Sequence, residues 1–393
     1  MRIGLITGEY PPMQGGLGAF TSILSAELMA QGHTTSTLTS LRAAAAQHPP
    51  HVQAEVDRWT PGAWPLVRRW IETTRPDVID LQFQTAAYAM SPFVHFLPNA
   101  IHAAFRHVRF VTTFHDLRVP YLFPKAGKLR DHVVLHLARA SDGVIVTNHE
   151  DQSRLHDQQI DCRLIPIGSN ILPPLPTPFD RHAFRAQHGF ADDAYLIGFF
   201  GLVNHSKGLN TLIEALTRLI AGGTPAQLVI IGGTGGSSDP SNAAYQREIE
   251  MLIARQGLQA AVHRTGFLDD FAVAQWLSAV DVVALPFHDG ASFRRGSLMA
   301  ALHYGRPVVS TTPHVTIPEL MHQQNVWLTP PRDAEPLAAA LEMLYQNPDV
   351  RAHLGAGAAA LSTQFGWTGI ARDTAGYFAH IAPNTHIVRS ESV

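Results

Sequence analysis

The stretch from Ser206 to Pro307 contains three polar segments: Ser206-Lys207-Gly208, Gly232-Gly233-Thr234-Gly235-Gly236 and Asp289-Gly290-Ala291-Ser292-Phe293-Arg294-Arg295-Gly296-Ser297. Each segment follows a short apolar run typical of a strand and precedes a run with helical spacing. The three segments are therefore predicted to lie at the carboxyl edge of a parallel sheet, where α/β proteins bind ligands. A lysine, a glycine-rich turn and two arginines at one edge indicate a site for a phosphorylated ligand.

The same alternation of strands and helices extends over the rest of the chain. Upstream strands are expected at 2–7, 34–39, 78–82, 110–114, 143–147 and 164–167, with a helix at 19–31 after a turn at 8–18. Downstream strands are expected at 195–200, 227–231, 262–265, 282–285 and 307–310, with helices at 209–221, 243–256, 272–279 and 298–304. This pattern predicts an α/β protein with two Rossmann-like, doubly wound domains that face a cleft.

A proline-rich segment, Pro173 to Pro178, separates the two runs of alternation, and 393 residues are too many for one core. The predicted domains are residues 1–173 and 179–365. A last helix, 366–383, has apolar residues at helical spacing and follows the second domain. The polar tail 385–393 is expected to be disordered.

Composition narrows the class of protein. The chain is 46% hydrophobic and 16% charged, with a net charge of −3, which is typical of a soluble globular protein and argues against general nucleic-acid binding. The single cysteine, Cys162, excludes an intrachain disulfide and thiolate metal sites. The first apolar run is too short for a signal peptide, and no run of about 18 apolar residues occurs. These features predict a cytoplasmic protein.

Several motifs, in this order, make the chain resemble a retaining glycosyltransferase of the GT-B fold, in glycosyltransferase family 4. They are Gly8-Glu9-Tyr10-Pro11-Pro12-Met13-Gln14-Gly15-Gly16, Phe114-His115-Asp116, Ile165-Pro166-Ile167-Gly168, Phe200 to Gly208, Gly266-Phe267-Leu268 and Gly305-Arg306-Pro307-Val308-Val309. The resemblance implies an acceptor-binding first domain, a second domain that binds a nucleotide-sugar, and a last helix that crosses back to the first domain. It also implies a hexosyltransferase that needs no metal or other cofactor, with a glycan, a lipid-linked molecule or a small molecule as acceptor.

Two departures from the family pattern are evident. Ser292 and Ala300 stand where the family usually carries two glutamates, and Leu202 stands where many members have an arginine that contacts the diphosphate. Arg294 and Arg295 are extra cations at the same edge and are candidates to replace it. Asp289 and Glu319 are the nearby acids that could take over the glutamate roles.

The candidate site combines residues from both domains. The resemblance places His115 near the donor sugar, with Asp116 structural. Charge and position indicate that Lys207, Arg294 and Arg295 bind the diphosphate and stabilise its charge in catalysis. The donor-binding set is Gly15, Gly16, Lys207, Gly233, Ser292, Phe293, Arg294, Arg295, Gly296 and Ser297. The competing interpretations are a solvated lysine, a salt bridge from the arginines to Asp289, and glycines that only form turns.

Alternative functions remain open. A sugar-nucleotide epimerase of the same fold would need acid and base residues in the cleft, and a non-catalytic sugar-nucleotide or glycan-binding protein would explain the missing glutamates. The segment Leu122 to Arg130 mixes apolar and basic residues, which suits either a peripheral contact with the inner face of a membrane or a solvated loop.

Overall fold

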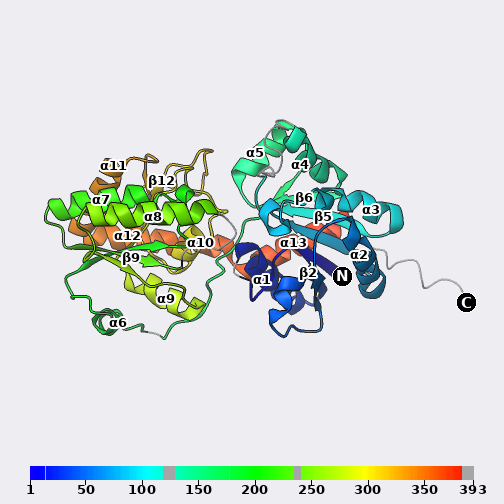
Figure 1. Cartoon of the computed structure of the whole chain (residues 1–393), viewed down its shortest axis with the longest axis horizontal. Helices are drawn as coiled ribbons and strands as arrows, with labels where there is room; N and C mark the ends of the chain where they lie inside the picture. Colours follow the sequence, from blue (N-terminus) through cyan, green and yellow to red (C-terminus); the bar gives the residue numbers. More distant parts are fainter. Residues whose placement is uncertain (14, 118–128, 177, 234–239, 383–393) are drawn as a thin grey trace, which may run out of the picture. The chain divides into compact units, whose positions relative to one another are not determined.

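The computed structural model describes residues 1–13, 15–117, 129–176, 178–233 and 240–382. Three predictions lie outside these residues: most of the segment 122–130, the glycines at 235 and 236, and the tail 385–393. The chain forms two compact units (Figure 1). Unit 1 comprises Met1–Gly168 and Gly366–Val393, and unit 2 comprises Ser169–Phe365.

Unit 1 is built on a parallel sheet with the order β3-β2-β1-β4-β5-β6-β7. Its strands are β1 (Arg2–Thr7), β2 (Thr34–Ser40), β3 (Val52–Val56), β4 (Val78–Phe83), β5 (Arg109–Phe114), β6 (Gly143–Val146) and β7 (Arg163–Leu164). The helices of its first part are α1 (Gly16–Ala30), α2 (Trp64–Thr74), α3 (Leu97–Ala104), α4 (Leu129–Ala140) and α5 (His149–Asp157). The strand order reverses between β1 and β4, which creates the crevice that doubly wound sheets use for ligands.

The central strands of unit 1 are buried along their whole length. Every residue of β4 is buried, and so are five of the six residues of β5. Strands covered on both faces usually read as continuous apolar runs. Asp80, Gln82 and Thr113 break that rule, since they are polar and at most 3% exposed.

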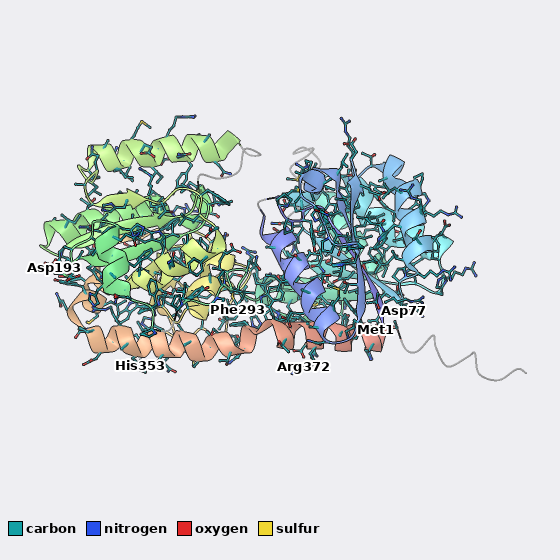
Figure 2. The ribbon with its side chains drawn as sticks, turned by 90° about the horizontal axis from the view of Figure 1, so that it is seen from below. Met1, Asp77, Asp193, Phe293, His353 and Arg372 are labelled. Atoms are coloured by element: carbon teal, nitrogen blue, oxygen red, sulfur yellow. The ribbon has the colours of Figure 1, made fainter. Side chains whose placement is uncertain are left out.

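Helix α13 (Trp367–Ile381) belongs to unit 1 and packs against α1. The rings of Phe20 and Trp367 lie 5.1 Å apart, and the backbone N–H of Val144 donates a hydrogen bond of 3.1 Å to the hydroxyl of Tyr377. Arg372 lies on the outer face of this helix (Figure 2). The helix predicted at the end of the chain therefore returns to the first part of the sequence.

Unit 2 has a second parallel sheet, with the order β10-β9-β8-β11-β12-β13. Its strands are β8 (Tyr195–Phe200), β9 (Ala226–Ile231), β10 (Val262–Arg264), β11 (Val282–Leu285), β12 (Val308–Thr311) and β13 (Trp327–Thr329). Its helices are α6 (Arg181–Gln187), α7 (Leu209–Ala221), α8 (Pro240–Arg255), α9 (Asp270–Ala279), α10 (Gly296–His303), α11 (Ala334–Gln346) and α12 (Pro348–Ser362). The order reverses between β8 and β11, so the segments that follow these strands flank the crevice of this sheet.

Among the differences between the predicted and the observed elements, two boundaries and one missed strand have identifiable reasons. Helix α1 begins at Gly16 rather than residue 19, because the extended backbone of Gly15 is its N-cap and the paired prolines lie farther upstream. Strand β7 ends at Leu164, before Pro166, which has no N–H for the sheet. Strand β3 went unpredicted because it is a short, half-buried edge strand without a continuous apolar run.

Candidate functional site

Lys207 lies at the carboxyl edge of the unit 2 sheet, just after β8. It ends the short 3₁₀ helix His205–Lys207, and Gly208, with φ of 69°, is the N-cap of α7. Gly201 follows β8 with φ of 119°, and a Cβ built on it would lie 2.0 Å from the Nζ atom of Lys207. The glycine therefore provides the space that the ammonium group occupies.

The surroundings of Lys207 disfavour its charged form. Its Nζ lies 3.5 Å from the hydroxyl of Ser297, the second residue of α10. Burial, and then the nearby charge of Arg295, lower the pKa of Lys207 to about 7. An anion bound at this edge would favour the ammonium form.

Both arginines pair with Asp289. Arg294 Nη2 lies 3.4 Å from Asp289 Oδ2, and Arg295 Nη2 contacts Oδ1 of the same carboxylate. Arg295 also donates a bond of 3.3 Å to the hydroxyl of Ser206, and its guanidinium lies 4.8 Å from the ring centroid of Phe287. The salt bridge considered from sequence is thus present. Two guanidinium groups contact the same carboxylate.

The helices at these edges start without side-chain caps, unlike several others in the chain. Within the part of the chain that the structure describes, no side chain caps α7 or α10. Side chains do cap α5, α6, α9 and α11, through Asn148, Asp180, Asp269 and Asp333. Because helix N-termini carry N–H groups that no carbonyl of the helix can satisfy, the uncapped starts favour an anion.

The other predicted donor-binding residues of unit 2 differ in what they offer. Ser292 is 6% exposed, and its hydroxyl accepts a bond of 3.5 Å from the backbone N–H of Arg294. Phe293 is a core residue whose ring lies 4.6 Å from that of Phe365 (Figure 2). Gly296 begins α10, and Gly233 follows β9 beside Phe267. Unit 2 thus brings the lysine, the arginines and the start of α10 together.

The positions of the missing glutamates do not offer carboxylates. Ala300 is completely buried within α10, and its methyl group cannot accept a hydrogen bond from a ribose. Asp289 is the acid that the structure places beside the arginines. Glu319 lies next to a different hollow, of about 510 Å³, whose other lining residues include Asn325 and His353.

In unit 1, His115 lies at the carboxyl edge, directly after β5. Its ring Nε2 is 2.9 Å from Oε1 of Gln82, and its ring meets that of Phe20 edge to face at 4.7 Å. Burial lowers the pKa of His115 to about 3, so the imidazole is neutral at physiological pH. Asp116 is 8% exposed and accepts a bond of 3.3 Å from Gln84, which fits its predicted structural role.

The glycine pair of unit 1 accommodates a carboxyl group. A Cβ on Gly15 would lie 2.0 Å from Oε2 of Glu9, whereas a Cβ on Gly16 would meet nothing within 4 Å. Burial raises the pKa of Glu9, and the charge of Arg42 opposes that shift. A side chain at position 15 would therefore meet the carboxyl group of Glu9, which accounts for the glycine there. A side chain at position 16 would meet no such neighbour at the start of α1.

Sequence reasoning did not identify the residues whose side chains contact the predicted site residues. Ser206 and Phe287 contact Arg295, and Gln82 contacts His115. For Gln82 there was a sequence signal, since Val78–Phe83 is an apolar strand interrupted only by Asp80 and Gln82. No comparable sequence signal marked Phe287, because aromatic residues are common after strands.

The described residues contain no group of three or more His, Cys, Asp or Glu side chains placed to hold a metal ion. None of their helices is long and apolar enough to cross a membrane.

The same fold occurs in several solved structures. Alr3699/HepE from Anabaena in complex with UDP has a TM-score of 0.76 and 22% identity, and the match covers 97% of this chain and all of that one. The Anabaena protein has also been solved with UDP-glucose. A sucrose-phosphate synthase from Thermosynechococcus elongatus has a TM-score of 0.77 and 20% identity over 97% of this chain and 98% of that one. At these identities the likeness establishes the GT-B architecture.

Comparisons of sequence show which families the chain is similar to. A D-inositol 3-phosphate glycosyltransferase from Xylanimonas cellulosilytica is 32% identical over 237 residues, which are 58% of this chain and 54% of the relative. The chain thus matches about half the length of that curated relative. Residues 14–171 match the family described as Glycosyltransferase Family 4, and residues 194–347 match Glycosyl transferases group 1. Because these two matches together span most of the sequence and both sheets, the chain is similar to the family 4 and group 1 glycosyltransferases over both of its units.

Proposed function

We propose that this protein is a retaining hexosyltransferase that moves a sugar from a nucleoside-diphosphate donor to an acceptor hydroxyl. The observation that carries the proposal is the convergence of Lys207, Arg294 and Arg295 beside the uncapped start of α10. These groups suit a diphosphate, because one arginine side chain can bind two phosphate oxygens at once and the free N–H groups at a helix N-terminus bind anions.

In the proposed reaction, the main contribution of the protein is to stabilise the charge of the leaving diphosphate. The bond between the anomeric carbon and the diphosphate oxygen breaks, and the acceptor oxygen bonds to that carbon on the same face. The proton of the acceptor hydroxyl passes to the leaving diphosphate, so no protein nucleophile is required. Lys207 and the arginines stabilise the departing charge, which removes the need for a metal ion or another cofactor.

Each remaining contact is assigned by its chemistry. The neutral ring of His115 accepts a hydrogen bond from a hydroxyl of the transferred sugar. Gly16, Gly233, Gly296 and Ser297 offer backbone N–H groups or a hydroxyl to the donor. Because Ala300 cannot bind a ribose, the nucleotide is held more by its diphosphate than by its sugar, and discrimination among bases is loose.

The substrates are proposed by class. The complexes of the Anabaena protein with UDP and UDP-glucose support a nucleotide-sugar donor. The acceptor is a glycan, a lipid-linked molecule or a small polyol, and the relatives named for D-inositol 3-phosphate support the last of these. The protein acts in the cytoplasm, and a lipid-linked acceptor would bring it to the inner face of a membrane.

The test is a panel of nucleotide-sugars incubated with the protein and candidate acceptors. We expect steady release of nucleoside diphosphate and a product whose anomeric configuration, measured by NMR, equals that of the donor. A changed sugar on an intact nucleotide would identify an epimerase, and binding without release would identify a non-catalytic protein. Removing the terminal phosphate from uridine or guanosine diphosphate should weaken binding far more than exchanging the base, and the opposite ranking would contradict diphosphate-dominated recognition.

A further inference from the structure

A buried chain of hydrogen bonds leads from Asp80 to His115 inside unit 1. Asp80 and Gln82 lie two residues apart on β4, so their side chains share one face of the sheet, and both are fully buried. Gln82 Nε2 donates to Asp80 Oδ2, and the hydroxyl of Thr113 donates to Asp80 Oδ1 at 2.8 Å. Gln82 Oε1 in turn lies 2.9 Å from His115 Nε2.

The carboxylate determines which way the Gln82 amide is turned. Burial raises the pKa of Asp80 to about 7, and above that pH its ionised carboxylate only accepts hydrogen bonds, so the NH₂ group of Gln82 faces Asp80 and its carbonyl oxygen faces His115. The opposite orientation would set two acceptor oxygens against each other in a buried site. Such an arrangement is costly away from water.

The orientation of the amide in turn determines the tautomer of His115. Because Gln82 Oε1 can only accept, the proton of the neutral ring must be on Nε2. Nδ1 then carries a lone pair, and within the described part of the chain the ring has no other hydrogen-bond partner. His115 can therefore accept a hydrogen bond through Nδ1.

We propose that Asp80 and Gln82 are positioning residues, which hold His115 as the Nε2–H tautomer so that Nδ1 accepts a hydrogen bond from a substrate hydroxyl. The tautomer follows from the contacts inside unit 1, whereas its importance for transfer rests on the proposed function. Neither Asp80 nor Gln82 needs to touch a substrate.

Asp80→Asn is the most informative substitution, because it should reverse the chain of hydrogen bonds. The hydroxyl of Thr113 donates to Oδ1 of Asp80, and we expect the asparagine to keep its oxygen at that position. Its NH₂ group then faces Gln82, whose amide must turn its oxygen toward residue 80 and its NH₂ toward His115. The ring nitrogen that meets this NH₂ must accept, which moves the proton to Nδ1.

Nitrogen-15 NMR of the full chain with labelled histidine, recorded well above the Asp80 pKa of about 7, reads the tautomer directly, with His115→Gln identifying the signals. We expect Nε2–H in the native protein, Nδ1–H in Asp80→Asn, and a mixture in Gln82→Met, which removes the acceptor at similar volume. Thr113→Val is the matched control, since it removes a buried hydrogen bond to Asp80 yet leaves the Gln82 amide facing the carboxylate, so Nε2–H should persist. Circular dichroism verifies that each variant is folded.

An Nδ1–H ring in the native protein would overturn the proposal, as would an unchanged tautomer in both Asp80→Asn and Gln82→Met. In the transfer assay, Asp80→Asn should lower kcat by about 10–100-fold, the usual effect of losing a partner that orients an active group. Its Kd for a nucleoside diphosphate should stay within about twofold, because the cations of unit 2 bind the phosphates. If the native protein transfers no sugar, the proposed function is wrong. The NMR result still tests whether Asp80 and Gln82 set the tautomer of His115.

Discussion

The ammonium group of Lys207 occupies the space that a side chain at Gly201 would need, with 2.0 Å between Nζ and a Cβ built on the glycine. A side chain at this position would require the ammonium end of the lysine to shift. The backbone of Gly201, at φ of 119°, is also strained for other residues. The position of the cation thus depends on a glycine six residues earlier in the chain.

Gly201→Ala should weaken the binding of a nucleoside diphosphate about as much as Lys207→Ala, because both remove the ammonium from its place. The expected loss is about 1.5–3 kcal/mol, the range for a hydrogen bond to a charged group. Isothermal calorimetry measures it. Gly189→Ala is the control, since Gly189 has φ of 79° and open space around it, so it reproduces the backbone strain without displacing the lysine. Equal losses of nucleoside-diphosphate affinity in Gly201→Ala and Gly189→Ala would contradict this explanation.

The affinity for diphosphate should fall as pH rises above about 7. The pKa of Lys207 is lowered to about 7, and bound phosphate favours the charged ammonium, so binding above this pH requires proton uptake. With one proton taken up, affinity falls by about tenfold per pH unit while the bound lysine stays charged. Measurements between pH 7.5 and 9, where the diphosphate is already ionised, isolate the lysine. Lys207→Met should abolish the slope, and a slope that persisted in this variant would assign the proton to another group.

Arg295→Lys should destabilise unit 2 more than Arg294→Lys. Arg295 combines its pairing with Asp289, a bond to the Ser206 hydroxyl and a position over the ring of Phe287. A lysine keeps the charge but loses the planar, multiply bonded geometry, which should cost about 1 kcal/mol more than at position 294. Urea unfolding of both variants followed by circular dichroism tests this ranking, and the reverse order would show that Arg294 is the structural member of the pair.

Tyr377→Phe should loosen the attachment of α13 to the sheet of unit 1. The Tyr377 hydroxyl accepts a bond from the backbone N–H of Val144, a residue only 3% exposed, and phenylalanine would leave that N–H without this partner. The expected loss is about 1–3 kcal/mol in the free energy of unfolding. Arg372→Ala on the exposed face of the same helix provides the comparison and should cost less than about 0.5 kcal/mol. If both variants unfold at the same urea concentration, the tyrosine is not what secures the helix.

Several features followed from the sequence alone because they depend on local patterns. Apolar runs such as Tyr195–Phe200 predicted buried strands, and the apolar spacing near the end of the chain predicted the last helix, which the structure places at Trp367–Ile381. The candidate cations could be named because Lys207, Arg294 and Arg295 each lie between a strand and a helix. In a parallel sheet that position alone brings residues to one edge.

The tertiary structure decided which groups meet, because side chains distant in sequence compete for the same partners. Sequence reasoning expected at least one arginine of the pair to bind the diphosphate and left a salt bridge to Asp289 open, and the fold brings Asp289 to both arginines. It gave His115 no partner, since Gln82 precedes it by 33 residues and reaches it only through the pairing of β4 with β5. The pKa of Lys207 has the same origin. It is set by burial and by Arg295, 88 positions along the chain, and such proximity exists only once the strands have assembled.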